Sequence, residues 1–260
     1  HRHGRGIRNQ ALNGHQLVAI GLAPVLLAQG LYVRRVTPRL PEPPGERRGA
    51  RGIGPPLRLL IAGDSAAAGV GADTQASGLS GRLAANLAPH FCIAWQLVAK
   101  TGNTIRDAID QLDAEPPETF DVAVVSVGVN DVVSRTRSGD WLERQRRLVE
   151  LLERKHGVHQ ILFSAIPPMQ AFPALPNPLA WYLGARAQYL NRVSSGWCRQ
   201  SGRCEFVQLS FPLQNDFIAA DGFHPGPAAY SLWAAHLAGL IQARFLRDES
   251  LAATPMAQPH

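Results

Sequence analysis

Short apolar runs alternate with longer stretches of helical periodicity from residue 57 onward. Runs that are apolar on both faces are typical of buried strands, and they lie at 57–63, 92–99, 122–127, 160–166 and 204–209. Helices are predicted between and after them, at 77–88, from Thr104 onward, at 140–155, at 178–199 and at 227–247. Five strands that alternate with helices predict an α/β domain whose parallel sheet is covered on both faces.

Two of the predicted helices have recognisable ends. Thr104 stands directly before the stretch IRDAIDQL and is a favourable N-cap, because its hydroxyl can accept a free backbone N–H. Gly157 follows the stretch 140–155 and is expected to end that helix.

An uncharged apolar run at 17–33 precedes the domain. It would span about 25 Å as a helix, short of a hydrocarbon core of about 30 Å, and Pro24 would kink it. A membrane anchor is the favoured interpretation; a signal peptide and a helix packed on the domain are the alternatives. No small-residue cleavage site follows, which weakens the signal peptide. More arginines follow the run than precede it, which mildly favours a body on the cytoplasmic side.

Composition divides the chain into four parts. Residues 1–37 form the basic leader that contains the apolar run, and 38–56 are rich in Pro, Gly and Arg, which predicts an extended linker. The α/β domain is expected at 57–248, and 249–260 form a C-terminal tail.

The net charge of +6 is unevenly distributed. Residues 1–58 hold ten arginines and two glutamates, which leaves 16 basic against 18 acidic residues for the rest of the chain. A nearly neutral domain is unlike a nucleic-acid-binding one, so no nucleic-acid partner is expected. The bias toward arginine over lysine indicates a GC-rich genome, and we expect a membrane-associated bacterial protein.

The three cysteines are Cys92, Cys198 and Cys204. Their spacing matches no zinc site, and three are too few for a disulfide framework. Cys198 and Cys204 could pair in an oxidising compartment, but isolated thiols are the favoured interpretation.

Residues suited to catalysis follow the predicted strands. Ser65 comes directly after the first strand, 100–103 after the second and 128–131 after the third, and 221–225 precede the last helix. The carboxyl ends of parallel strands form the usual site of such sheets. Each motif alone is also compatible with a helix cap or a turn.

Together these residues compose a nucleophilic site. A serine hydroxyl needs a base, which His224 provides, and Asp221 can fix the imidazole tautomer. The amides of Ser65 and Gly102 and the side chain of Asn130 can stabilise an oxyanion.

The chain resembles the SGNH (GDSL) hydrolase superfamily. It carries the G-D-S block at 63–65, the glycine block at Gly102, the G-x-N-D block at 128–131 and the D-x-x-H block at 221–224, and the resemblance covers roughly 57–247. It implies a flavodoxin-like three-layer α/β/α fold with strand order 2-1-3-4-5. It also implies a hydrolase that acts through an acyl-serine intermediate without metal or cofactor, with Ser65, Asp221 and His224 as the triad and Ser65, Gly102 and Asn130 as the oxyanion hole. The acids matching Asp64 and Asp131 mainly organise loops in the superfamily.

The sequence indicates the substrate less clearly than it indicates the catalytic residues. The apolar stretch 167–176 offers Met169, Phe172 and Leu175 for an acyl pocket, although it could equally be a packing loop. We expect a serine esterase that acts on acyl esters, short-chain or lysophospholipid, and that associates with a membrane through 17–33. An acyltransferase, a carbohydrate acetylesterase and a catalytically silent membrane-anchored binding protein are the alternatives.

Overall fold

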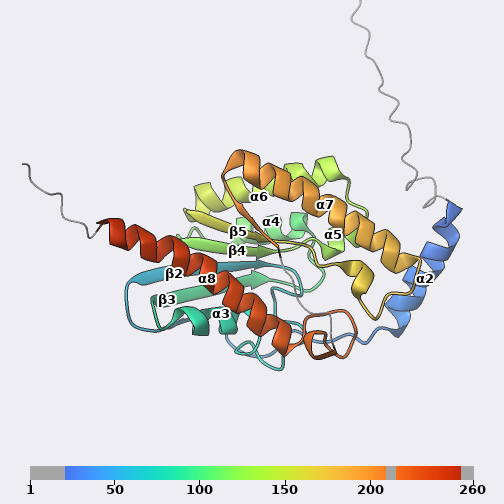
Figure 1. The fold of residues 1–260 in the computed structure, drawn as a ribbon, viewed down its shortest axis with the longest axis horizontal. Coiled ribbons are helices and arrows are strands. Elements are labelled where there is room, and N and C mark those ends of the chain that lie inside the picture. Colours follow the sequence, from blue (N-terminus) through green and yellow to red (C-terminus); the bar gives the residue numbers. More distant parts are fainter. Residues whose placement is uncertain (1–20, 209–214, 253–260) are drawn as a thin grey trace, which may run out of the picture.

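A six-stranded sheet forms the centre of the protein in the computed structural model, which describes residues 21–208 and 215–252 (Figure 1). The strands lie in the order β1-β3-β2-β4-β5-β6. Their bounds are β1 Arg48–Arg51, β2 Pro56–Gly63, β3 Cys92–Ala99, β4 Val122–Ser126, β5 Gln160–Ser164 and β6 Glu205–Val207.

Helices cover both faces of this sheet. They are α2 Ala23–Val36, α3 Leu79–Leu87, α4 Ile105–Ala114, α5 Val129–Val133, α6 Ser138–His156, α7 Leu179–Ser201 and α8 Pro227–Ala252, with 3-10 turns η1 Met169–Ala171 and η2 Asn215–Phe217. The predicted ends are observed: Thr104 caps α4 in a capping box with Asp107, and Gly157 caps α6 in the left-handed conformation.

The predicted fold class is confirmed, with one correction to the strand count. The strands β2 to β6 pair in parallel, and numbered in chain order from β2 they have the expected order 2-1-3-4-5. The additional strand β1 lies in 38–56, the stretch expected to be an extended linker, and pairs antiparallel with β3 from Arg48↔Gln96 to Arg51↔Ile93. The sequence RGAR has no alternation of apolar and polar residues, so it does not predict a strand. An edge strand can be held by backbone hydrogen bonds alone and does not need that pattern.

Alternate residues of β2 point into two separate cores. Leu60 and Ala62 of β2 belong to the cluster formed with α4, α6 and α7, whereas Leu59 and Ile61 belong to the cluster formed with α3 and α8. This is the two-residue period of a strand that is buried on both faces.

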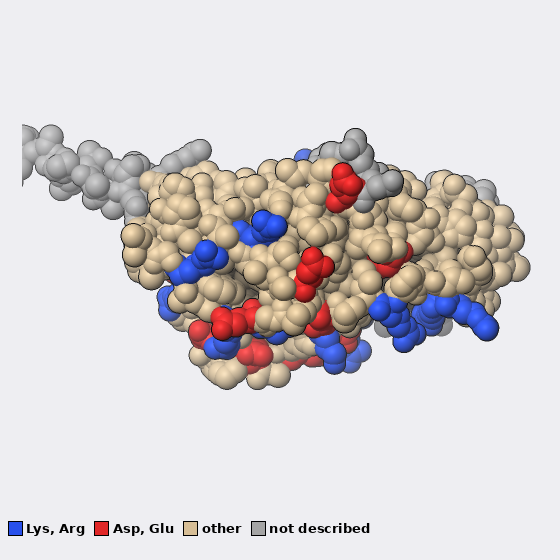
Figure 2. Space-filling view, turned by 90° about the horizontal axis from the view of Figure 1, so that it is seen from below, with Lys and Arg blue, Asp and Glu red and all other residues tan. Residues whose placement is uncertain are grey.

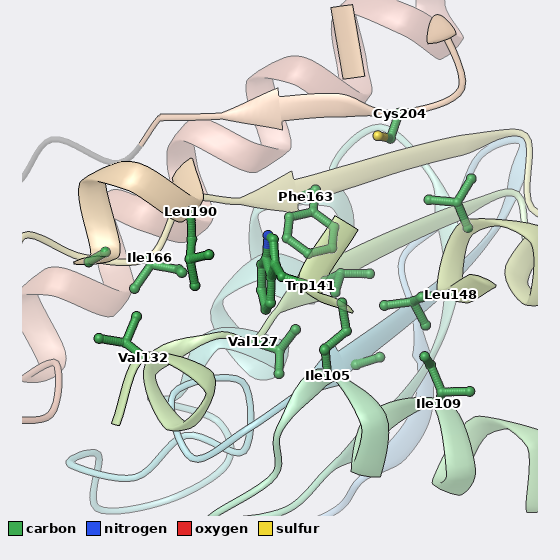
Figure 3. Packing of buried hydrophobic residues seen from close by; sticks show 14 of the residues in the cluster. Ile105, Ile109, Val127, Val132, Trp141, Leu148, Phe163, Ile166, Leu190 and Cys204 are labelled. Atoms are coloured by element: carbon green, nitrogen blue, oxygen red, sulfur yellow. The ribbon is translucent and has the colours of Figure 1, made fainter. Parts of the chain in front are cut away.

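Trp141 of α6 lies in the middle of the first core (Figure 3). Its ring meets Phe163 of β5 edge-on, with a centroid distance of 6.1 Å, and its Nε1 donates to Ser194 Oγ at 2.8 Å. Because the indole N–H is fully buried, this bond is what allows a tryptophan at the position.

The helix α2 rests on the N-terminal end of α7. Leu26 is buried in the first core, and Gln29 donates to Asn177 O at 2.6 Å and accepts from Leu179 N at 3.0 Å. Part of the apolar run, 17–20, lies outside the described residues. Among the residues that the structure does describe, no helix has the length and apolar composition required to cross a membrane.

Cys198 and Cys204 form a disulfide, with their Cα atoms 5.1 Å apart, so the preference for isolated thiols was wrong. The tight turn through Gly202, which ends α7 in the left-handed conformation, brings the two residues together before β6 begins. Sequence separation alone could not show this turn.

We predict that unfolding and alkylating the purified protein without reductant adds one alkyl group. It should be on Cys92, because Cys92 is free and the other two cysteines are joined in the disulfide. Reduction before alkylation should raise the number to three. Intact-protein mass spectrometry measures both states, and three groups without reductant would contradict the disulfide.

Candidate active site

Three predicted residues meet at the carboxyl end of the sheet. Ser65 lies in the turn after β2, and its Oγ is 2.9 Å from His224 Nε2. The other ring nitrogen, Nδ1, is 2.5 Å from Asp221 Oδ2. The second carboxylate oxygen of Asp221 accepts the amides of Phe223 and His224, both at 3.0 Å. The carboxylate, the imidazole and the hydroxyl therefore form one continuous chain of hydrogen bonds.

Asp221 is ionised in this arrangement. Only 5% of the residue is exposed, and burial alone would raise its pKa. The hydrogen bonds from the His224 ring and from the amides of His224 and Phe223 outweigh burial, so the pKa of Asp221 lies below its ordinary value. An ionised Asp221 keeps a proton on His224 Nδ1 and leaves Nε2 free to accept the hydroxyl proton of Ser65.

The turn that carries Ser65 is fixed from two directions. Gly63 has a φ of +155°, and a Cβ there would lie 1.8 Å from Ser126 O of the neighbouring strand, so only glycine fits. From the helix layer, the hydroxyl of Tyr230 of α8 donates to Ala66 O at 3.1 Å or to Val70 O at 2.7 Å. Ser65 is thus presented by a rigid loop.

The predicted oxyanion residues lie on adjoining loops. Gly102 has a φ of +91° in the turn after β3, and the next residue, Asn103, donates to Gly63 O at 3.0 Å. Asn130 Nδ2 donates to Asn103 O at 2.9 Å. Asn103 therefore connects the loops of Ser65, Gly102 and Asn130. Its importance was missed because an asparagine after a strand has the appearance of an ordinary turn residue.

An apolar pocket opens beside Ser65 and His224. It has a volume of about 80 Å³, and its apolar walls include Val129, Ile166, Phe172, Phe217, Phe223 and Trp233. The rings of Phe172 and Phe223 pack at 4.9 Å between centroids.

Only one of the three predicted pocket residues lines this cavity. All three are buried in the first core, and of these only Phe172 also lines the pocket. The stretch 167–176 thus serves both as a wall and as a packing loop. Phe217 and Phe223 were missed because the irregular loop before α8 has no periodicity that marks a buried face.

Two buried acids hold the loops of the site. Burial raises the pKa of Asp64 to about 7, although the carboxylate accepts the amide of Ala66 at 3.1 Å. Burial raises the pKa of Asp131 to about 6, against the bonds from Ile105 N at 2.9 Å and Thr136 Oγ1 at 3.1 Å. Neither contacts Ser65 Oγ, and both connect backbone segments.

The family model of the GDSL-like lipase/acylhydrolase family matches residues 61–232. The chain belongs to this family. It is therefore an ester-hydrolysing enzyme of the GDSL/SGNH type, as the four sequence blocks predict. Comparison with curated proteins gives no match.

Solved structures of esterases have the same fold. The lipase/acylhydrolase from Enterococcus faecalis is 19% identical, with a TM-score of 0.52 over 72% of this chain and 96% of that one. A catalytic mutant of an acetylxylan esterase from Geobacillus stearothermophilus is 19% identical, with a TM-score of 0.50 over 74% and 96%. A carbohydrate esterase family 2 enzyme from Corynascus thermopiles is 16% identical, with a TM-score of 0.56 over 74% and 67%.

The raised pKa of Asp64 predicts a pH-dependent contribution to stability. Between about pH 4 and pH 7 the folded state keeps a proton that the unfolded state releases, so this contribution decreases as the pH rises, by at most about 1.4 kcal/mol per pH unit. The free energy of unfolding of the wild type should therefore decrease from pH 5 to pH 8 relative to Asp64→Asn.

Urea unfolding at both pH values measures this difference. Asp73→Asn is the matched control, because Asp73 is exposed on the same stretch of chain. A wild type that gains stability over Asp64→Asn at the higher pH would contradict the assignment.

Proposed function

We propose that the protein is a serine esterase that hydrolyses acyl esters through an acyl-Ser65 intermediate. The single observation that carries this proposal is the hydrogen-bonded chain from Ser65 through His224 to Asp221.

The reaction runs in two halves. Ser65 Oγ bonds to the ester carbonyl carbon while its proton passes to His224 Nε2, and the oxyanion forms near Gly102 and Asn130. The bond to the alcohol oxygen then breaks, and His224 returns its proton to that oxygen. A water molecule next attacks the acyl-enzyme with His224 as base, and the carboxylic acid leaves as Ser65 regains its proton.

The pocket supports a short to medium acyl chain. A volume of about 80 Å³ has room for roughly three water-sized groups at about 30 Å³ each, so it encloses about three carbons beyond the carbonyl, and its open mouth leaves room for the chain to extend. An open polar depression that includes Gly102 would receive the alcohol portion. It is lined by residues such as Lys100, Thr101, Gly102, Asp107 and Gln111. These surroundings favour an ester that joins an apolar acyl chain to a polar alcohol.

We predict that the hydrolysis of p-nitrophenyl esters from C2 to C16 peaks between C4 and C8 and falls steeply for longer chains. In Ser65→Ala the turnover should drop by at least about a thousandfold for every ester, because the nucleophile is absent. Ser77→Ala is the matched control, since Ser77 caps an exposed turn away from the pocket. Retained turnover in Ser65→Ala would contradict the mechanism, and a maximum at C2 or C16 would contradict the pocket assignment.

We also propose that α2 binds the surface of a lipid bilayer. The helix exposes Leu27, Leu31 and Tyr32 by 60%, 60% and 62%, and its residues before Arg34 are uncharged. The cations Arg34 and Arg35 lie in the last turn of the helix, and Arg39 follows it. Figure 2 shows basic side chains along one edge of the end of the molecule that α2 occupies in Figure 1. Exposed apolar side chains that are followed by arginines suit a helix that inserts shallowly into a bilayer, with the arginines beside anionic head groups.

Vesicle binding measures this. The full chain should sediment with vesicles of phosphatidylglycerol and phosphatidylcholine. The double variant Leu27→Asp with Leu31→Asp should bind at least about tenfold more weakly, since it lacks two leucines that the bilayer would bury. Leu232→Asp, on the exposed side of α8, is the control and should bind normally. Equal binding by the double variant would contradict the proposal. A dimer that the same substitutions dissociate would assign the face to a second copy of the chain.

The Cys198–Cys204 disulfide supports a location outside the cytoplasm, because disulfides persist in oxidising compartments. This proposal replaces the weak preference for the cytoplasmic face that the arginine distribution gave. The experiment is to quench the cells that make the protein with acid, which stops thiol–disulfide exchange, and then to count the free thiols of the protein. Three free thiols would contradict the proposal.

A further inference from the structure

Glu42 contacts the turn that carries Gly102, although it lies outside the residues that the family model matches. Its Oε1 accepts hydrogen bonds from the amide and the hydroxyl of Thr101, at 2.7 Å and 2.9 Å. Its Oε2 accepts from an Arg47 guanidinium nitrogen at 3.0 Å. A carboxylate from the N-terminal segment thus holds the residue directly before Gly102.

The turn has little else to hold it on that side. Thr101 and Gly102 are exposed, and beyond Gly102 and its two chain neighbours no atom lies within 4 Å of the position that a Cβ on Gly102 would take. Side-chain packing therefore does not fix the peptide between these two residues. Hydrogen bonds hold the two residues that flank Gly102 instead. Thr101 N donates to Glu42 on one side of Gly102, and Asn103 Nδ2 donates to Gly63 O on the other.

The segment that carries Glu42 is itself fixed to the domain. Arg47 O accepts the amide of Leu97 at 2.7 Å, in the pairing that continues into β1. Pro44 O accepts the amide of Gln75 at 2.9 Å, and Gln75 is buried. Glu42 thus directly precedes two attachments of the segment to the body, at Pro44 and at Arg47, and does not lie on a free linker.

The carboxylate of Glu42 is ionised. Burial would raise its pKa, but the hydrogen bonds from Thr101 and the neighbouring Arg47 lower it below its ordinary value. Bonds to a charged acceptor are roughly twice as strong as those between neutral groups. Two of them on one residue restrain its position well.

We propose that Glu42 is a positioning residue for catalysis. It restrains Thr101, and thereby the peptide that follows Thr101, so that the Gly102 amide points at the oxyanion. This inference rests on the proposed function, because it assigns Gly102 to the oxyanion hole. An oxyanion donor acts in the transition state more than on the bound ester, so a loosened donor lowers kcat and leaves KM nearly unchanged.

Three variants of the full chain test the inference. Glu42→Ala removes both bonds to Thr101, Glu42→Gln keeps an acceptor without the charge, and Glu46→Ala is the matched control on the same segment, since Glu46 is exposed. We expect kcat for p-nitrophenyl butyrate to fall about tenfold or more in Glu42→Ala, to fall less in Glu42→Gln and to stay unchanged in Glu46→Ala. Titration with a fluorophosphonate gives the fraction of active Ser65, so that kcat is calculated per active site.

A second measurement separates positioning from loss of structure. An alkylboronic acid forms a tetrahedral adduct with a catalytic serine, and its Ki should rise in Glu42→Ala by about the factor by which kcat falls, while KM stays constant. Unchanged kcat and Ki in Glu42→Ala, or equal losses in Glu46→Ala, would overturn the inference. If the activity falls only as much as the fraction of Ser65 that reacts with the fluorophosphonate, kcat per active site is unchanged, and the inference is overturned as well. Full activity in Ser65→Ala would overturn the proposed function, and this inference with it.

Discussion

The hydrogen bonds of one imidazole connect the parts of this molecule. His224 is bound to Asp221, three residues before it, and to Ser65, 159 residues before it. The first bond is local, because a tight turn also brings the Asp221 carboxylate to two backbone amides. The second bond depends on the whole sheet, since it joins the turn after β2 to the loop before α8. A substitution that shifts either loop would separate the nucleophile from its base, however well the rest of the core packs.

Much of this arrangement could be predicted from the sequence, because it rests on local periodicity and on strand ends. Strands that are buried on both faces are continuously apolar, which is why β4, buried at every position, lies within the apolar run 122–127. Residues that follow such strands must meet at one edge of a parallel sheet, so the sequence alone predicts that Ser65 and Asn130 lie there. The glycine at position 63 shows the same constraint from the structural side, since Ser126 O occupies the space where a side chain would lie.

What could not be predicted rests on contacts without a period. The edge strand β1 is held by backbone bonds that any residue can make, so RGAR gave no indication of it. Phe217 and Phe223 line the pocket from the segment before α8. Met169 and Phe172 both belong to the first core, but only Phe172 also lines the pocket. Glu42 lies nearly sixty residues from Thr101, and only the folded chain brings its carboxylate to that amide.

The most direct test of a serine mechanism is to label the protein with a fluorophosphonate and to map the modified peptide by mass spectrometry. The account predicts one label, on Ser65, with labelling lost in His224→Ala because the hydroxyl then has no base. A label on a different residue, or labelling that does not depend on His224, would contradict the account.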